Sequence, residues 1–417
     1  MEPVMSYSRR IHIGVLFFYL AQGLCFSTWA SRIPDIKDLF NVQDLLYWGM
    51  VLFLIPVGKF VAIPLAGWLV NKLGSRIMVQ VSILGYALSL FLIGYTSTFH
   101  SLVLLGIFLF FFGVFWNLCD ISLNTQGIGI EKMSGKTIMA TFHGAWSLAA
   151  CLGALIGYFM IISDIAPAIH FTIVAVAILI IVTICRRYLQ EDVAQEPTIA
   201  DTEKVELEEK KTSVWSYVRR PEMILIQLGI VGFFALIVES AMFDWSGIYF
   251  QSVLSLDKSL QIGFLVFMVM MTTGRFLTNF SYSKIGKQHT LQLAGAFIFL
   301  GFFITALLGN ISSILSVKVV LNSLGFMLVG LGISCMVPTI YTFVGLKSKT
   351  PVGIAITLLN SVSFVGSLVA PLLIGSISKG VGMQFAYIII GLFGLCILLM
   401  TSFCAVFRIN EQPQKIK

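Results

Sequence analysis

Runs of about 20 apolar residues recur from one end of the sequence to the other, and no other feature restricts the possible folds as strongly. An α-helix needs about that length to cross the hydrocarbon core of a bilayer. The runs do not alternate between polar and apolar residues, as the strands of a membrane β-barrel would. Only 11% of the residues are charged, against about 25% in ordinary soluble domains. We therefore predict an all-α polytopic membrane protein.

The pattern predicts twelve transmembrane helices in two six-helix bundles. The predicted spans are residues 11–30, 45–70, 77–97, 101–125, 138–162, 166–186, 222–250, 259–283, 289–309, 313–345, 352–378 and 383–407. The first is interpreted as a retained span, because no A-x-A cleavage site follows it. The long polar stretch at residues 187–221 is predicted to be a cytoplasmic linker between the bundles, residues 1–186 and 222–417.

The distribution of basic residues predicts the topology. Twenty of the 27 Lys and Arg residues fall in segments on one side of the predicted spans, whereas the other side carries only Arg32, Lys37, Lys258 and Lys379. Basic segments accumulate on the cytoplasmic side, so both termini are predicted to be cytoplasmic. This asymmetry explains the net charge of +7, and we expect no nucleic-acid partner.

The two predicted bundles contain related sequences. WASRIPDIKDLF in the first half matches WSGIYFQSVLSL in the second, and thirty residues after each leading tryptophan lies a cation, Lys59 in GKF and Arg275 in GRF. Each second span then ends in a basic turn, GWLVNKLGSR or NFSYSKIGKQ. Repeats of this kind build secondary transporters, so we predict two pseudo-symmetric bundles.

The first basic turn resembles a known motif. GWLVNKLGSR is similar to the loop between spans two and three of the major facilitator superfamily, G-x-x-x-D-R-x-G-R-[RK], although Ser75 replaces an arginine. DISLNTQGIGIEKMSGKTIMATFHGAWS, ESAMFDWSGIY and GLGISCMVP resemble one bacterial branch, broadly related to the fucose-type sugar permeases. The resemblance implies twelve spans, alternating access and the bacterial inner membrane. It also implies a cytoplasmic gate loop made of Gly67, Asn71 (in place of the usual aspartate), Lys72, Gly74 and Arg76.

Acidic residues inside predicted spans are candidates for proton coupling, because an ionised side chain there costs about 2.5–3.5 kcal/mol. Glu239 is the strongest candidate, since a carboxyl in an apolar cavity can take up and release a proton. The alternative is a structural carboxylate that accepts hydrogen bonds. Asp244 is expected at the external mouth, where it either contributes to coupling or pairs at an outer gate. The two acids diverge by about 140° on a helix and cannot form one dyad.

Asp120 is predicted close to the cytoplasm. In the superfamily that the motif resembles, an acid low on span four often pairs with the basic loop after span two. Asp120 could therefore form a latch with Lys72 and Arg76, or it could act on substrate or proton.

Further polar and aromatic residues are predicted to line a substrate cavity. Lys59 and Arg275 could hold an anionic substrate, with Arg275 binding a carboxylate through two hydrogen bonds. They could also be counter-ions to Asp120 and Glu239, or extend toward the membrane surface. The other candidates are Gln22, Trp29, Trp116, Asn117, Asn124, Trp146, Trp245 and Asn360, although most aromatic residues in such a chain pack between helices or meet lipid.

Together these features predict a secondary active transporter, and not an enzyme. The first choice is proton-coupled symport of a small polar or anionic solute of sugar or sugar-acid type, and the alternative is a drug/proton antiporter. A lipid flippase or a transport-like sensor is less favoured, because the linker is too short for an output domain. No phosphate-binding loop or metal-ligand spacing occurs, so no cofactor or metal is expected beyond the proton gradient. The expected partners are a small-molecule substrate and the bilayer, and a monomer is expected.

Overall fold

The computed structural model describes residues 2–134, 138–190, 217, 219, 221–311, 313–350 and 352–408. No strand occurs among them. The helices are α1 (Glu2–Ser31), α2 (Ile33–Leu39), α3 (Leu45–Leu52), α4 (Leu54–Leu73), α5 (Ser75–Tyr95), α6 (Leu102–Ser134), α7 (Met139–Ile162), α8 (Pro167–Cys185), α11 (Met223–Ile248), α12 (Gly263–Ala306), α13 (Leu315–Ser334), α14 (Met336–Lys347), α15 (Val352–Val381) and α16 (Met383–Phe403).

Within the described residues, eleven stretches are long and apolar enough to cross a membrane. One of them contains α12, whose 44 residues would extend about 66 Å as a straight helix, about twice the thickness of a bilayer core. Its backbone leaves helical geometry at Gly286, with φ 79° and ψ 166°, so α12 is two membrane-crossing lengths joined by a turn. The predicted all-α fold with twelve transmembrane segments is confirmed.

Gly74, between α4 and α5, has nearly the same backbone conformation as Gly286, with φ 84° and ψ 152°. This region of backbone space is open almost solely to glycine. Both glycines lie in the basic turns that the sequence repeat matches. The internal repeat therefore extends to local backbone geometry.

The described residues fall into two compact units, each with most of its contacts within itself. Unit 1 holds the described residues up to 190, Phe243–Met268 and Pro371–Gly380. Unit 2 holds the described residues from 217 to 242, Val269–Ala370 and those from 381 to 408. Helices α11, α12 and α15 thus contribute to both units. Much of the predicted linker lies outside the described residues, and the predicted division into residues 1–186 and 222–417 stays a prediction.

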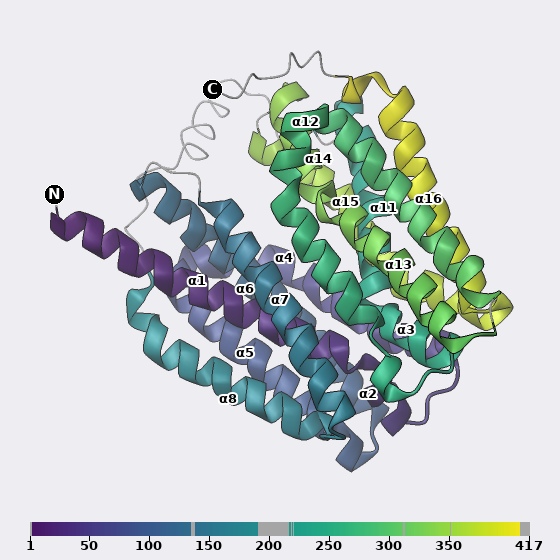
Figure 1. The fold of residues 1–417 in the computed structure, drawn as a ribbon. Helices are drawn as coiled ribbons and strands as arrows, with labels where there is room; N and C mark the ends of the chain where they lie inside the picture. The colour runs from purple at the N-terminus through teal and green to yellow at the C-terminus, as the bar shows by residue number, and fades with distance from the viewer. Residues whose placement is uncertain are drawn as a thin grey trace. The chain divides into compact units, whose positions relative to one another are not determined.

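In unit 1, α1 packs along α7 and α8, while α6 packs against α4 and α5 (Figure 1). Small residues let the first pair approach closely. Gly23 of α1 lies against the backbone of Trp146, and Gly153 of α7 lies against Ser27. Packing of small residues is the usual source of helix association in a membrane, where no hydrophobic driving force acts between helices.

In unit 2, α12 packs against α13 and α16 through small residues. Gly301 of α12 lies against the backbone of Gly325, and Gly394 of α16 lies against the backbone of Phe299. On α11, Phe234 stacks on Phe393 of α16 with 5.0 Å between ring centroids. These contacts fix α12, the helix that carries Arg275.

Candidate functional site

Lys59 of α4 lies over the indole ring of Trp116 of α6, with Nζ 2.8 Å from the ring centroid. The quadrupole of the ring attracts such a cation, by about 2 kcal/mol where water is excluded. The next residue, Asn117, donates a hydrogen bond from Nδ2 to the carbonyl oxygen of Lys59 at 2.9 Å. Adjacent residues of α6 therefore hold both the side chain and the backbone of Lys59. The structure brings these three predicted binding residues together.

Close helix approach permits this contact. Gly58, the glycine of GKF, lies against the carbonyl oxygen of Phe110 of α6 and leaves no room for a Cβ atom. The corresponding glycine of GRF, Gly274, lies against Ser334 of α13. In each unit, the glycine before the cation therefore lets the cation-bearing helix approach its neighbour.

Phe26 of α1 is the centre of an aromatic cluster that includes Trp116. Its ring centroid lies 4.9 Å from that of Trp116, 5.4 Å from that of Trp146 and 4.6 Å from that of Phe243. Sequence analysis selected the two tryptophans and missed both phenylalanines. Phe26 follows Gln22 by four residues, a spacing that places two side chains on one helix face. That spacing could have identified it.

Three other predicted binding residues are fully buried. The residues Gln22, Trp29 and Trp245 are 0%, 1% and 0% exposed, and Trp29 packs on Phe112. Within the described residues, the amide atoms of Gln22 have no hydrogen-bond partner. Buried polar atoms are normally paired. The amide of Gln22 is therefore suited to a polar group of a bound solute.

Asp244 lies in the part of α11 that belongs to unit 1, directly after Phe243 of the aromatic cluster. It is partly buried. Unit 1 therefore combines an acid, a cation and a set of aromatic faces. The role of Asp244 in coupling or gating stays a prediction.

Glu239 lies in the part of α11 that belongs to unit 2, where it forms an ion pair with Arg275 of α12. Nη2 of Arg275 and Oε1 of Glu239 are 3.8 Å apart, and the side chains are 24% and 19% exposed. Arg275 is therefore the counter-ion of Glu239, one of the alternatives that the sequence left open. Both side chains of this pair are therefore partly, not fully, buried within the protein.

Asp120 belongs to a hydrogen-bonded chain between α1 and α6. Asn124 donates from Nδ2 to Oδ2 of Asp120 at 3.3 Å, and its own Oδ1 accepts from the hydroxyl of Tyr19 at 2.8 Å. The ring of Tyr19 is stacked on Phe142. The structure thus joins two predicted residues, Asp120 and Asn124, directly, and Tyr19, which sequence analysis missed, connects them to α1. The latch between Asp120 and the basic loop stays a prediction.

The remaining predicted residues lie apart from the aromatic cluster. Asn360 of α15, in unit 2, accepts a hydrogen bond from the hydroxyl of Tyr341 at 2.9 Å. In the loop motif, Gly67 and Asn71 are exposed and Lys72 lies over Trp68 at 4.8 Å. Gly74 supplies the turn, and Arg76 is the second residue of α5. Their action as a gate stays a prediction.

Each of the four basic residues on the sparsely charged side pairs with an aspartate, at the end of unit 1 that carries α2. The pairs are Arg32 with Asp35 at 2.6 Å, Lys37 with Asp38 at 3.5 Å, Lys258 with Asp164 at 2.6 Å and Lys379 with Asp44 at 2.5 Å. The last two pairs join the N-terminal helices to segments from the second half of the sequence. The side-chain hydrogen bond from the lysine holds the pKa of Asp164, and likewise that of Asp44, below its usual range.

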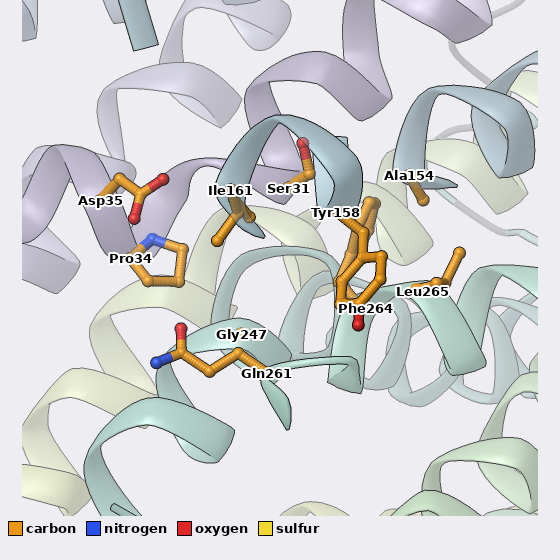
Figure 2. A pocket seen from close by; sticks show the side chains of 10 residues that line it. All are labelled: Ser31, Pro34, Asp35, Ala154, Tyr158, Ile161, Gly247, Gln261, Phe264 and Leu265. Carbon is orange, nitrogen blue, oxygen red and sulfur yellow. The ribbon is translucent and has the colours of Figure 1, made fainter. Parts of the chain in front are cut away.

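A small cavity lies at the same end of unit 1. Figure 2 shows Asp35 of α2, Tyr158 of α7 and Gln261 among its lining residues. Its space of about 20 Å³ is enough for a single water molecule. Burial raises the pKa of Asp35, and the guanidinium of Arg32 opposes that rise. Tyr158 also donates to the carbonyl oxygen of Ser259 at 2.9 Å, so this end is closed by several contacts.

A comparison with protein families identifies the class of membrane protein to which this fold belongs. The model of the Major Facilitator Superfamily matches residues 11–351. The chain belongs to the major facilitator superfamily. The resemblance noted in the loop motif is thereby confirmed at the level of the superfamily, and the protein is a multi-pass membrane transporter of that type.

Relatives within the superfamily come from bacteria. An uncharacterised transporter of Sinorhizobium fredii is 24% identical over 388 residues, covering 93% of this chain and 96% of its own. An uncharacterised transporter of the superfamily from Yersinia pestis is 26% identical over 394 residues, with 94% of both chains covered.

Solved structures of the superfamily share the fold. A D-xylose–proton symporter has a TM-score of 0.71 at 15% identity, covering 96% of this chain and 99% of its own. A nucleoside transporter has a TM-score of 0.70 at 12% identity, covering 95% and 100%. At these identities the likeness establishes the fold alone.

Proposed function

We propose that this transporter carries a small polar or anionic solute, of sugar or sugar-acid type, by alternating access in symport with a proton. The observation that carries the proposal is the lysine on an indole face in unit 1. Lys59 supplies a fixed positive charge beside Trp116, and the aromatic cluster centred on Phe26 supplies flat apolar faces. Gln22 supplies an amide donor and acceptor. A sugar ring with a carboxylate combines an apolar face, hydroxyl groups and a negative charge, and so matches these groups.

Proton coupling is assigned to Glu239. An anionic group that binds Arg275 would compete with the carboxylate of Glu239 for the same guanidinium. Once displaced, the carboxylate is stabilised by taking up a proton, because a buried, unpaired charge is costly. Substrate and proton would then bind together, and neither the empty nor the loaded carrier would hold an unpaired charge. A D-xylose–proton symporter has the same fold as this chain, which is compatible with this proposal.

The first experiment is to identify a ligand. Purified protein is screened for a rise in the unfolding temperature with sugars, sugar acids, amino acids and lipophilic cations, since a ligand that binds only the folded state stabilises it by mass action. Stabilisation by sugars or sugar acids supports the proposal. Stabilisation by lipophilic cations alone would favour the alternative, a drug/proton antiporter, which the positive charge of Lys59 does not favour.

The second experiment tests coupling. In proteoliposomes, Glu239→Gln is expected to retain exchange of substrate between the two sides and to lose accumulation driven by a pH gradient, because glutamine is isosteric and cannot take up a proton. Glu222→Gln, the same substitution in the same unit at a residue that is hydrogen bonded to Thr350, tests whether loss of a carboxylate elsewhere has the same effect. Gradient-driven accumulation by Glu239→Gln at the wild-type rate would exclude Glu239 from coupling.

A further inference from the structure

We propose that unit 2 binds one anionic phospholipid from the membrane, in a cavity between the two arms of α12 and α13. This binding site is separate from the transport function proposed above. The cavity has a volume of about 330 Å³. Its lining residues are Gly274, Leu277, Thr278, Phe280, Ser281, Lys284, Ile285, Thr290, Leu293, Ala294, Phe297, Leu331, Ser334 and Cys335.

The walls of the cavity are apolar in effect, although several hydroxyl groups line it. The hydroxyl of Thr278 donates to the carbonyl oxygen of Gly274 at 2.8 Å, and that of Ser334 donates to Leu331 at 2.6 Å. Thr290 and Ser281 are hydrogen bonded to each other across the turn of α12 at 2.8 Å. These groups already have partners within the protein. A polar solute would therefore gain little from the cavity, whereas an acyl chain would fit it.

The cavity faces the membrane. Four of its lining side chains lie on the exposed surface of the transmembrane segments: Leu277 is 49% exposed, Phe280 61%, Ile285 41% and Leu293 43%. An acyl chain can therefore enter directly from the bilayer. A water-soluble ligand would first have to cross hydrocarbon.

A positive charge lies at one end of the cavity. Lys284 is exposed, and its Nζ lies 5.7 Å from the ring centroid of Phe280. It belongs to the basic turn around Gly286, which is predicted to face the cytoplasm. The cytoplasmic leaflet holds the anionic phospholipids, and basic pockets between transmembrane helices bind their headgroups. The lysine selects the headgroup charge, and the cavity holds the chain.

The test uses full-length protein in detergent, with lipid binding measured by native mass spectrometry. Phosphatidylglycerol and phosphatidylcholine with identical acyl chains are compared, so that only the headgroup charge differs. The wild type is expected to retain one phosphatidylglycerol in preference to phosphatidylcholine. Lys284→Gln is expected to weaken phosphatidylglycerol binding about 5-fold and to leave phosphatidylcholine binding unchanged.

Two matched variants complete the test. Lys349→Gln removes an exposed lysine of the same unit on the same predicted side, outside the cavity, and is expected to bind both lipids as the wild type does. Ala294→Leu adds bulk at the cavity wall and is expected to weaken both lipids, with folding checked by gel filtration. Equal losses in Lys284→Gln and Lys349→Gln would overturn the proposal, as would full lipid binding by a folded Ala294→Leu. If Ala294→Leu does not fold, the comparison of Lys284→Gln with Lys349→Gln alone tests the proposal.

Discussion

Residues of α6 hold Lys59 in place. The indole of Trp116 attracts the ammonium group and the amide of Asn117 holds the backbone, so two consecutive residues fix one charge. Arg275, its equivalent in the repeat, instead meets a carboxylate, that of Glu239. Two residues that occupy matched places in the sequence have therefore acquired different partners.

Lys59→Gln is expected to weaken binding of a sugar acid about 10-fold or more, because a charge-assisted hydrogen bond and its cation–π support are lost together. Binding of the corresponding neutral sugar should change by less than about 3-fold. Both affinities can be measured by the shift in unfolding temperature across a ligand titration. Lys318→Gln, on α13 in the other unit, serves as the charge control. Equal losses for the acid and the neutral sugar would assign Lys59 a structural role only.

Helix α11 carries two of the acids predicted to take part in proton coupling. Its first part carries Glu239 in unit 2 and its last part carries Asp244 in unit 1. Five residues correspond to a rise of about 7.5 Å and a rotation of about 500°, so the two carboxylates point in different directions from one rigid rod. A proton gained at Glu239 therefore changes the charge on the helix that also carries Asp244.

Two turns between helices depend on glycine in the same way. Gly74→Ala and Gly286→Ala are each expected to lower the free energy of unfolding by about 1–3 kcal/mol, because a side chain does not tolerate their backbone conformation. Gly67→Ala is the matched control, since no atom lies within 4 Å of an added Cβ and the residue is helical. The unfolding temperature of the three purified variants gives the measurement. A loss in Gly67→Ala as large as in the other two would contradict the explanation.

At the scale of the molecule, the closed end of unit 1 depends on aspartates that must be ionised. The pKa values of Asp44 and Asp164 are lowered in the folded protein. Their contribution to stability is therefore present above the ordinary aspartate pKa of about 3.9 and is lost as the pH falls through the lower, folded value. Asp35, whose pKa is raised by burial, has the opposite effect on stability, because its ionisation destabilises the folded protein as the pH rises.

The expected result is a fall in the unfolding temperature of the wild type between about pH 5 and pH 3. The double variant Asp44→Asn, Asp164→Asn should start lower and fall less steeply over the same range. Thermal unfolding in detergent at stepped pH provides the measurement. Parallel curves for the two proteins would show that these pairs do not contribute to the acid sensitivity.

Much of the fold could be predicted from the sequence because the membrane imposes it. An apolar run that must satisfy its own backbone becomes a helix wherever it occurs, so predicted spans such as 138–162 and 166–186 closely match α7 and α8. The site could be predicted only in part. Polar residues such as Lys59 and Glu239 stand out against an apolar background, whereas Phe26 is one of 35 phenylalanines and only its spacing from Gln22 distinguishes it in the sequence. Likewise, no local pattern indicates that Phe243–Met268 packs with the N-terminal helices.

The four aspartate–cation pairs at the α2 end of unit 1 also determine how a solute would meet the carrier there. Because each lysine or arginine is paired with an aspartate, that face exerts almost no long-range electrostatic attraction on a charged solute. Encounter rates on that side should depend little on ionic strength, in contrast to proteins that steer their ligands through a net field. Under the proposed function, discrimination between anionic and neutral solutes would then begin only after entry.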